Sequence, residues 1–149
     1  MRRYRARLRE RGIRVRAVMR RDPVLGAMRF GPATHLTPGE QAVLRRFCVG
    51  LGKLPVEPDA VAAFGSRVKG LSDDASDLDV VVFFDVGRDP GIESQLSRIA
   101  LEARRPYCSG QYGIFLNPVP IFAADGDALL ESIRDEMEVV WKRPGRRKR

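Results

Sequence analysis

The sequence has 149 residues, which is enough for one domain with a real core but not for two full domains. Hydrophobic residues make up 44% and charged residues 31%, which is typical of a globular protein with somewhat more charge than average. No apolar run approaches the ~18 residues that cross a bilayer, and the arginine-rich start lacks the apolar stretch of a secretory signal. We therefore expect a soluble, cytoplasmic protein that has no membrane partner.

The net charge of +8 is unevenly distributed along the chain. Residues 1–34 hold 11 basic and 2 acidic residues, and residues 142–149 hold 6 basic and no acidic residues. Residues 35–141 hold 10 basic and 17 acidic residues, a net charge of −7. We therefore expect a basic N-terminal arm (1–34), an acidic domain (35–141) and a basic C-terminal tail (142–149). Such ends bind nucleic acid or an acidic partner, or are simply solvated, and both interpretations stay open.

The first regular elements are predicted by periodicity and capping. Residues 13–18 alternate apolar and basic side chains, as an edge strand does. A helix is predicted to follow Thr37, because Thr37, Pro38 and Glu40 form the pattern of a capping box. Apolar residues then recur at helical spacing as far as Leu51.

Strands and helices alternate in the rest of the domain. Residues 60–64 form a continuous apolar run typical of a strand buried on both faces, and residues 78–84 form the strongest strand, interrupted only by Asp79. Further predicted elements are a helix at about 92–105, a strand within 112–122 that its prolines mark as edge or irregular, a helix at 127–136 and a strand at 137–141. This order predicts an α/β (α+β) fold, a small mixed β-sheet with helices packed against it.

Two carboxylates mark the start of the strongest strand. Asp77 and Asp79 are two residues apart, so their side chains leave the same face. Alone, such a pair is more often a strand-entry turn than a metal site. Carboxylates this close repel one another, and a divalent cation supplies the missing positive charge. Mg²⁺ suits the pair because it accepts carboxylate and phosphate oxygens and keeps water in its other positions.

A glycine-serine turn ends the preceding apolar strand. Gly65 allows the backbone to approach a phosphate closely, and Ser66 adds a hydroxyl. Arg67 and Lys69 follow in a predicted helical turn, where they would neutralise phosphate charge or be ordinary surface charge. If the two strands are neighbours, a phosphate cradle and a metal clamp face one another, as nucleotidyl transfer requires.

The pattern Gly65-Ser66, ten residues, then Asp77-Leu78-Asp79 resembles the signature of the DNA polymerase β-like nucleotidyltransferase superfamily. The flanking residues are similar to the minimal nucleotidyltransferases, whose members often pair with HEPN proteins as antitoxins. The close resemblance covers about 25 residues around the two motifs, and a looser resemblance in the order of elements runs from Thr37 to Trp141. It implies a nucleotidyltransferase fold.

The resemblance also implies roles for the motif residues. Gly65 and Ser66 would bind the phosphates of an NTP, most simply ATP, and Asp77 and Asp79 would be catalytic and hold Mg²⁺. A hydroxyl would then attack the α-phosphate and release pyrophosphate. The acceptor would be a tyrosine of a HEPN-type partner toxin, another protein, a small molecule or RNA.

Active members of this superfamily use a third carboxylate on a later strand. Residues 111–122, where that strand is expected, contain no Asp or Glu, and Asn117 is the only amide there beyond Gln111. Three explanations stay open. A nearby aspartate substitutes (Asp85, Asp125 or Asp127), the enzyme is slow and uses one metal ion, or the fold is kept for binding only. The corresponding alternatives are a catalytically degenerate antitoxin that acts by binding, and a nucleic-acid-binding protein that uses its basic arms.

The cysteines, the histidine and several acidic residues are expected to have no role in the site. Cys48 and Cys108 lie far apart and lack a histidine nearby, so they are expected to be small buried hydrophobic residues rather than zinc ligands. His35 lies just outside the helix cap and is expected to be structural or exposed. Four acidic residues near the C-terminus are expected to form a solvated face, namely Glu131, Asp135, Glu136 and Glu138.

Overall fold

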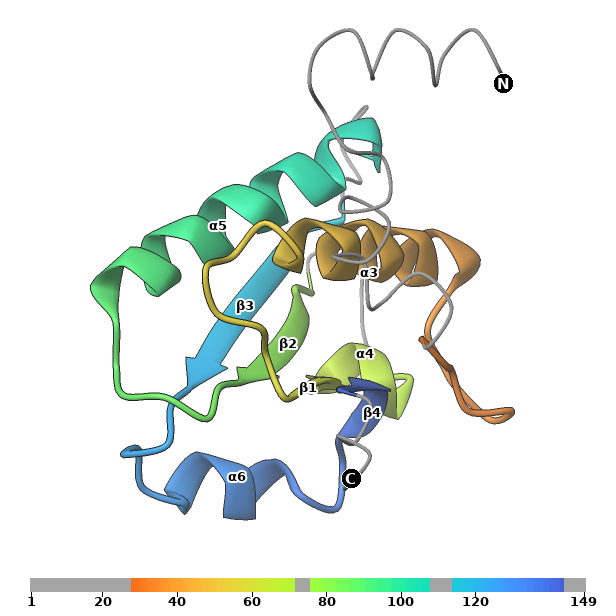
Figure 1. The fold of residues 1–149 in the computed structure, drawn as a ribbon. Helices are drawn as coiled ribbons and strands as arrows, with labels where there is room; N and C mark the ends of the chain where they lie inside the picture. Colours follow the sequence, from red (N-terminus) through yellow and green to blue (C-terminus); the bar gives the residue numbers. More distant parts are fainter. Residues whose placement is uncertain (1–27, 72–75, 108–113, 144–149) are drawn as a thin grey trace, which may run out of the picture.

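The computed structural model describes residues 28–71, 76–107 and 114–143. Within them, helices and strands alternate as the sequence predicts (Figure 1). The elements in chain order are α3 (Pro38–Leu51), β1 (Ala60–Phe64), α4 (Ser66–Lys69), β2 (Leu78–Phe83), α5 (Pro90–Arg104), a 3-10 turn (Arg105–Tyr107), β3 (Leu116–Ile121), α6 (Ala128–Ile133) and β4 (Glu138–Lys142). The predicted mixed α/β fold is confirmed. The predicted edge strand at residues 13–18 lies outside the described residues.

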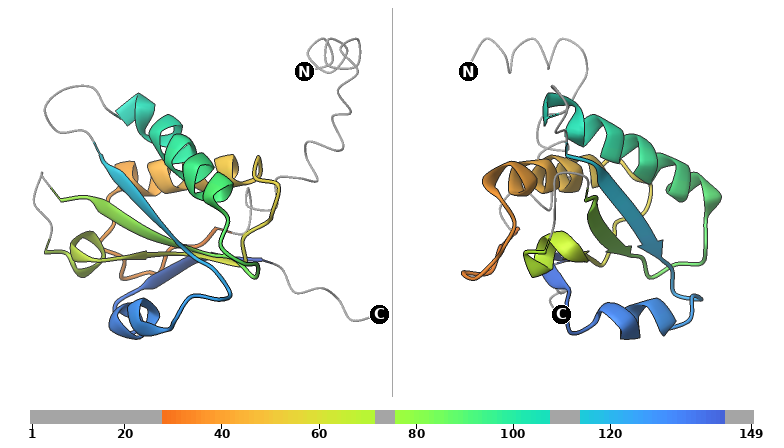
Figure 2. Two further views of the ribbon diagram at one scale, coloured as in Figure 1. Left: turned by 90° about the vertical axis from the view of Figure 1, so that its left-hand side faces the viewer. Right: turned by 180° about the vertical axis from the view of Figure 1, so that it is seen from behind.

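The four strands form one mixed sheet in the order β3-β2-β1-β4. β1 is antiparallel to β2 and to β4, whereas β2 and β3 are parallel. The parallel pair requires a crossover connection, and α5 provides it. Helices α3 and α5 lie together over one side of the sheet, and α6 lies on the opposite side (Figures 1 and 2). No helix in the described part of the chain is long and apolar enough to cross a membrane.

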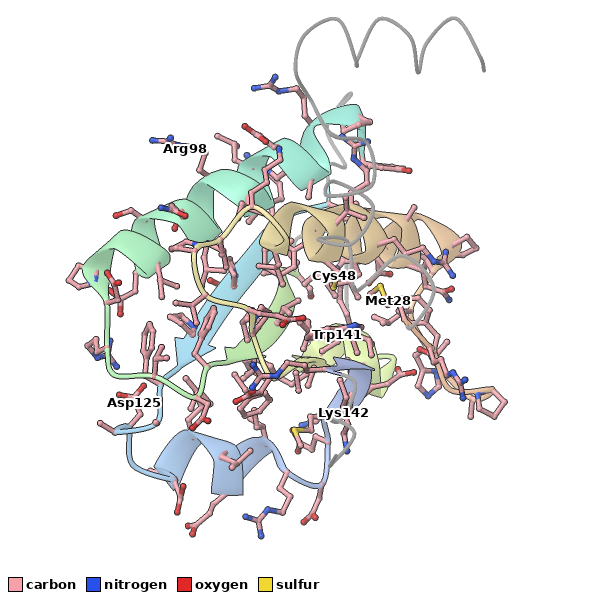
Figure 3. All side chains as sticks on the ribbon, in the orientation of Figure 1. Met28, Cys48, Arg98, Asp125, Trp141 and Lys142 are labelled. Atoms are coloured by element: carbon pink, nitrogen blue, oxygen red, sulfur yellow. The ribbon has the colours of Figure 1, made fainter. Side chains whose placement is uncertain are left out.

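The main core lies between the sheet and the α3–α5 layer. Leu78, Val80 and Val82 of β2 belong to this core, so the alternating residue Asp79 faces away from it. Cys48 of α3 is fully buried, as predicted, and burial raises the pKa of its thiol to about 12. Figure 3 shows its side chain beneath α3. Cys108 lies outside the described residues.

The helix ends follow the local sequence rules. α3 has the predicted capping box, in which the Glu40 N–H donates to the Thr37 hydroxyl and the Thr37 N–H donates to the Glu40 carboxylate, both at 3.2 Å. α5 begins two residues earlier than predicted, because the Asp89 carboxylate accepts from the Gly91 N–H at 2.8 Å and Pro90 takes the first helical position. α6 is shorter than the predicted helix.

Proline protects one edge of the sheet. The carbonyl of Phe115, just before β3, accepts from the Leu78 N–H at 2.7 Å, and the carbonyl of Ile121 accepts from the N–H of Phe84, just after β2, at 2.9 Å. The backbone groups of the residues that alternate with these in β3 therefore point away from β2. Pro118 and Pro120 occupy such outward positions and have no N–H to offer another strand. The prediction of an edge strand is therefore confirmed, and the prolines suppress pairing with another chain.

The other edge of the sheet is covered by residues assigned from sequence to the N-terminal arm. The Arg29 N–H donates to the Val140 carbonyl of β4 at 2.8 Å. The Glu138 carboxylate accepts from the Gly31 N–H at 2.6 Å and from the Thr34 hydroxyl at 2.7 Å. Glu138 therefore holds a segment onto the sheet edge, and its predicted place on a solvated face is wrong. The end of the arm packs against the domain.

Candidate functional site

The glycine-serine turn and the aspartate pair meet because β1 and β2 are neighbours. Phe64, the last residue of β1, stands opposite Asp79 in the antiparallel register. A Cβ built on Gly65 would lie only 2.8 Å from Asp79 Oδ2. The backbone of the turn therefore lies directly against the carboxylate, which is the arrangement expected if the two strands pair.

Gly65 has a conformation that side chains disfavour. Its φ is +84° and its ψ is −162°, and it precedes the first residue of α4. α4 begins at Ser66, and the first N–H groups of a helix lack partners within the helix. Backbone donors beside a hydroxyl are a suitable arrangement for phosphate oxygens.

The two carboxylates differ in exposure. Asp77 is exposed just before β2 begins, whereas Asp79 is half-buried within β2 on the face turned away from α3 and α5. Among the described residues, none of the ion pairs involves either carboxylate. The negative charge of the pair is thus not neutralised by a lysine or arginine of the described chain.

Asn117 occupies the place opposite Asp79 on the parallel strand β3. Its Nδ2 donates to Asp79 Oδ1 at 3.0 Å, while Asp79 Oδ2 faces Gly65. The two oxygens of Asp79 therefore have different neighbours. The sequence identified Asn117 only as an amide in the expected strand, and the parallel register places it opposite Asp79, one of the two predicted metal ligands.

The distant aspartates do not replace a third carboxylate. Asp85 follows Asp79 by six residues in an extended chain, a separation of about 20 Å at ~3.3 Å per residue. The Asp125 carboxylate is bound to Arg88 and to the Phe122 N–H, both at 2.9 Å, and lies beyond the end of β3 (Figure 3). Asp127 lies further still along the chain. Substitution by any of these three residues is therefore wrong, because both strands run away from the site.

Two predicted phosphate-binding cations are engaged with protein groups. The Arg67 guanidinium, whose side chain is 12% exposed, donates to the Ser76 carbonyl and lies near Glu40. Lys69 Nζ lies 2.6 Å from Glu136 Oε1, and both side chains are about two-fifths exposed. Glu136 is nevertheless exposed, as are Glu131 and Asp135, so these three residues lie on a solvated face as predicted. His35 is exposed, as expected, and its ring packs on Gly70 at the end of α4.

The donor groups fit one divalent cation better than two. The described residues contain no cluster of three or more His, Cys, Asp or Glu side chains that could hold a metal ion. Mg²⁺, however, is commonly held by one or two carboxylates together with substrate phosphates and water. Asp77 and Asp79, beside a turn that can accept phosphates, meet that requirement. A second ion would lack the third carboxylate, because Asn117 stands there.

One hollow of the described residues lies away from the turn and the aspartate pair. It has a volume of about 610 Å³ and is lined by residues that include Pro118–Ile121, Asp125 and Leu129, without Gly65 or Asp79. The candidate site is defined by its polar groups and not by this hollow.

Residues 44–113 match a family model described as "Nucleotidyltransferase domain", and this region contains both halves of the motif. No curated protein matches the chain. A similar solved structure is that of a candidate nucleotidyltransferase from Sulfolobus solfataricus, with 15% identity, a TM-score of 0.42 and coverage of 76% of this chain and 94% of that chain. The resemblance to the minimal, HEPN-associated branch stays a prediction. The chain thus carries a region similar to the nucleotidyltransferase domain, in a mixed α/β fold consistent with that domain.

Proposed function

We propose that the protein is an enzyme that transfers a nucleoside monophosphate, AMP from ATP, to a hydroxyl group. The observation that carries this proposal is the contact between the Gly65 backbone and the Asp79 carboxylate. Because a phosphate cradle and a cation-binding pair share one junction, a triphosphate bound at the turn would lie beside the carboxylates. The family match over residues 44–113 supports the same reaction class.

Each residue has a distinct task in this proposal. The Ser66 hydroxyl and the backbone at Gly65 bind the terminal phosphates, which orients the α-phosphorus toward the open face of the sheet. Asp77 and Asp79 would hold Mg²⁺, which withdraws electron density from the phosphate oxygens when bound. The acceptor oxygen forms a bond to the α-phosphorus, the bond to the β-phosphate oxygen breaks and pyrophosphate leaves.

A group in the site must also accept the proton of the acceptor hydroxyl. The amide of Asn117 cannot accept it at neutral pH, unlike a carboxylate at that position. The exposed Asp77 and water are the remaining acceptors in the site. Lack of a dedicated base typically costs ~10²–10⁴-fold in rate, so we propose a slow enzyme.

The test uses ATP labelled at the α-phosphate, with Mg²⁺ and a hydroxyl acceptor. Wild-type protein is expected to transfer label, and the double variant Asp77→Asn, Asp79→Asn is expected to lose transfer completely, because it removes the charge that holds the cation. Asp85→Asn is the matched control, since Asp85 is an exposed aspartate beyond the far end of β2. Unchanged transfer in the double variant would refute the proposal.

A tyrosine of a HEPN-type partner toxin is the acceptor that the sequence resemblance suggests. We propose it as the first substrate to examine, by mixing the protein with the product of the adjacent gene. If the partner is neutralised by wild-type protein but not by the double aspartate variant, catalysis is responsible. Label on another molecule, such as RNA, would replace this acceptor.

A second candidate function is that of an antitoxin that neutralises its partner by binding alone. Asn117 favours it, because an amide stands where an active site would have a third carboxylate. Neutralisation that persists in the double aspartate variant would favour this function over transfer.

Nucleic-acid binding by the basic ends stays a prediction, since residues 1–27 and 144–149 lie outside the described residues. Contacts to phosphates would make affinity fall steeply with salt. A salt titration of the full chain against RNA and DNA checks this, and flat binding would end the hypothesis.

A further inference from the structure

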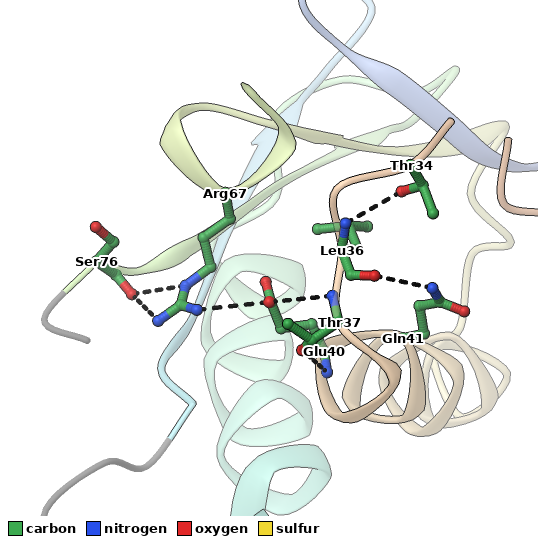
Figure 4. A network of polar contacts seen from close by, with 7 residues as sticks. All are labelled: Thr34, Leu36, Thr37, Glu40, Gln41, Arg67 and Ser76. Atoms are coloured by element: carbon green, nitrogen blue, oxygen red, sulfur yellow. Dashed lines mark hydrogen bonds and ion pairs between the residues drawn. The ribbon is translucent and has the colours of Figure 1, made fainter. Parts of the chain in front are cut away.

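A buried arginine connects three segments beside the candidate site. Arg67 Nε and Nη2 donate to the Ser76 carbonyl at 2.8 and 2.6 Å, and Nη1 lies 3.5 Å from Glu40 Oε1 (Figure 4). The two side chains are only 12% and 3% exposed. One guanidinium therefore joins α4, the entry to β2 and the first turn of α3.

Glu40 is the buried carboxylate that lies beside the Arg67 guanidinium. It is the one charged residue fully buried in the described part of the chain. Its Oε1 accepts from the Thr37 N–H, and its Oε2 is buried and has no hydrogen-bond partner. Removing either partner of such a pair leaves the other buried without a compensating charge, so Arg67 and Glu40 each depend on the other.

The carbonyl of Ser76 and the N–H of Asp77 belong to the same peptide unit. The peptide unit is planar, so fixing the Ser76 carbonyl also fixes the orientation of the Asp77 N–H and restrains the Asp77 backbone. Two residues further on, the Leu78 N–H donates to the Phe115 carbonyl at 2.7 Å. Arg67 thus fixes the backbone at Ser76, the residue directly before Asp77.

We propose that Arg67 is a positioning residue that aligns Asp77 and Asp79 for the metal ion, with Glu40 holding the guanidinium in place. The inference rests on the proposed function and differs from the phosphate contact predicted from sequence. Arg67 acts through the Ser76 carbonyl rather than on the substrate. The guanidinium of Arg67 makes two hydrogen bonds to the Ser76 carbonyl and also lies near Glu40. The ammonium group of a lysine cannot make all three contacts at once.

The experiment measures Mn²⁺ binding by the full chain in the presence of ATP, using electron paramagnetic resonance. Wild-type protein should bind Mn²⁺, and the double variant Asp77→Asn, Asp79→Asn should not. Arg67→Lys is expected to weaken Mn²⁺ binding about tenfold, because the aspartates lose their alignment. The matched control is Arg46→Lys, since Arg46 Nε also donates to a backbone carbonyl, that of Ala103 at 3.1 Å, between α3 and α5.

Glu40→Gln provides a second variant that keeps the fold, because glutamine also completes a capping box. It is expected to weaken Mn²⁺ binding about threefold, and the double variant Arg67→Lys, Glu40→Gln should be no weaker than Arg67→Lys alone, since Glu40 acts through Arg67. In Arg67→Ala, added methylguanidinium should restore binding and methylammonium should not. Restoration by the guanidinium alone would show that this group, rather than a positive charge of any shape, is required.

The outcomes separate this inference from the proposed function. If wild-type protein does not bind Mn²⁺ at Asp77 and Asp79, both fail. If it binds and Arg67→Lys binds equally well, only the positioning role is overturned. Equal weakening by Arg67→Lys and Arg46→Lys would also overturn it, because the effect would then be general loss of stability. Selective weakening with guanidinium rescue supports it.

Discussion

Carboxylates at the two ends of the sheet differ in whether an arginine pairs with them. Where β3 ends, Asp125 is bound to Arg88 at 2.9 Å, and Asp59 at the start of β1 is paired with Arg143. Where β2 begins, Asp77 and Asp79 have no such partner in the described part of the chain. Arginines therefore neutralise Asp125 and Asp59 at one end of the sheet, whereas no lysine or arginine of the described residues pairs with Asp77 or Asp79 at the other.

This difference separates structural carboxylates from candidate ligands. Hydrogen bonds from the Phe122 N–H and from Arg88 lower the pKa of Asp125, and the pKa of Arg88 is raised in return. The Arg88 guanidinium also lies 5.4 Å from the Phe122 ring centre, which restricts its orientation. Asp125 already has a cation, whereas the aspartate pair still needs one.

Gly65→Ala should have the largest effect. The substitution adds a Cβ 2.8 Å from Asp79 Oδ2 at a φ of +84°, so the carboxylate or the turn must move. Displacement of this kind can cost about 100-fold in rate, which label transfer from ATP would show. Gly126→Ala at the other end is the matched control, because its Cβ would meet nothing within 4 Å. Equal activities in the two variants would contradict the importance of the Gly65 contact.

Asn117→Asp should add a third carboxylate to the site that holds Asp77 and Asp79. Without metal, a third carboxylate opposite Asp79 repels it, so the melting temperature is expected to fall. With Mn²⁺, affinity should rise about tenfold, equivalent to ~1.4 kcal/mol. Asn117→Ala removes the 3.0 Å hydrogen bond without adding charge and serves as the control. Metal affinity that does not rise would show that this position lies outside the coordination sphere.

Most of the fold could be predicted because its signals are local. The capping box at Thr37, the apolar run of β1 and the prolines of β3 each determine nearby backbone through a few neighbouring residues. From the sequence, the glycine-serine turn and the aspartate pair face one another if the two strands are neighbours, and the pairing of β1 with β2 meets that condition. The roles assigned to these residues stay predictions.

The remaining errors arise from contacts between distant segments. Nothing local distinguishes Glu138 from a solvated residue, because its partners Gly31 and Thr34 lie more than 100 positions away. The partners of Arg67 are likewise set by how α3 and α4 pack, so its inward direction was missed. Asp125 and Asp127 were proposed as substitutes for a third carboxylate because the direction of β3 relative to β2 cannot be read from the sequence, and the parallel direction carries both away from Asp79. Asp85 is excluded by its distance along β2 alone.

Asp125→Asn should change the dependence of stability on acid. Because the folded pKa of Asp125 is lowered, this residue stabilises the fold at pH values above its unfolded pKa of ~3.9, and the contribution is lost as pH falls through the folded pKa. The variant should therefore be less stable at neutral pH and lose less stability between neutral and strongly acidic pH. Denaturant unfolding at several pH values checks this, with Asp85→Asn as the control. Parallel curves for variant and wild type would contradict the pairing.

Lys69→Met should have the smallest effect of the four. The Lys69–Glu136 ion pair is about two-fifths exposed, and solvent screening limits such pairs to ~0.5 kcal/mol of stability. Because the ammonium is directed to Glu136, nucleotide affinity should also stay the same, which titration of ATP would measure. A loss of about tenfold would instead correspond to a charge-assisted bond to phosphate and would restore the role predicted from the sequence. In that case Lys69 would exchange Glu136 for the nucleotide on binding, and Glu136→Gln should tighten nucleotide binding by removing the competing carboxylate.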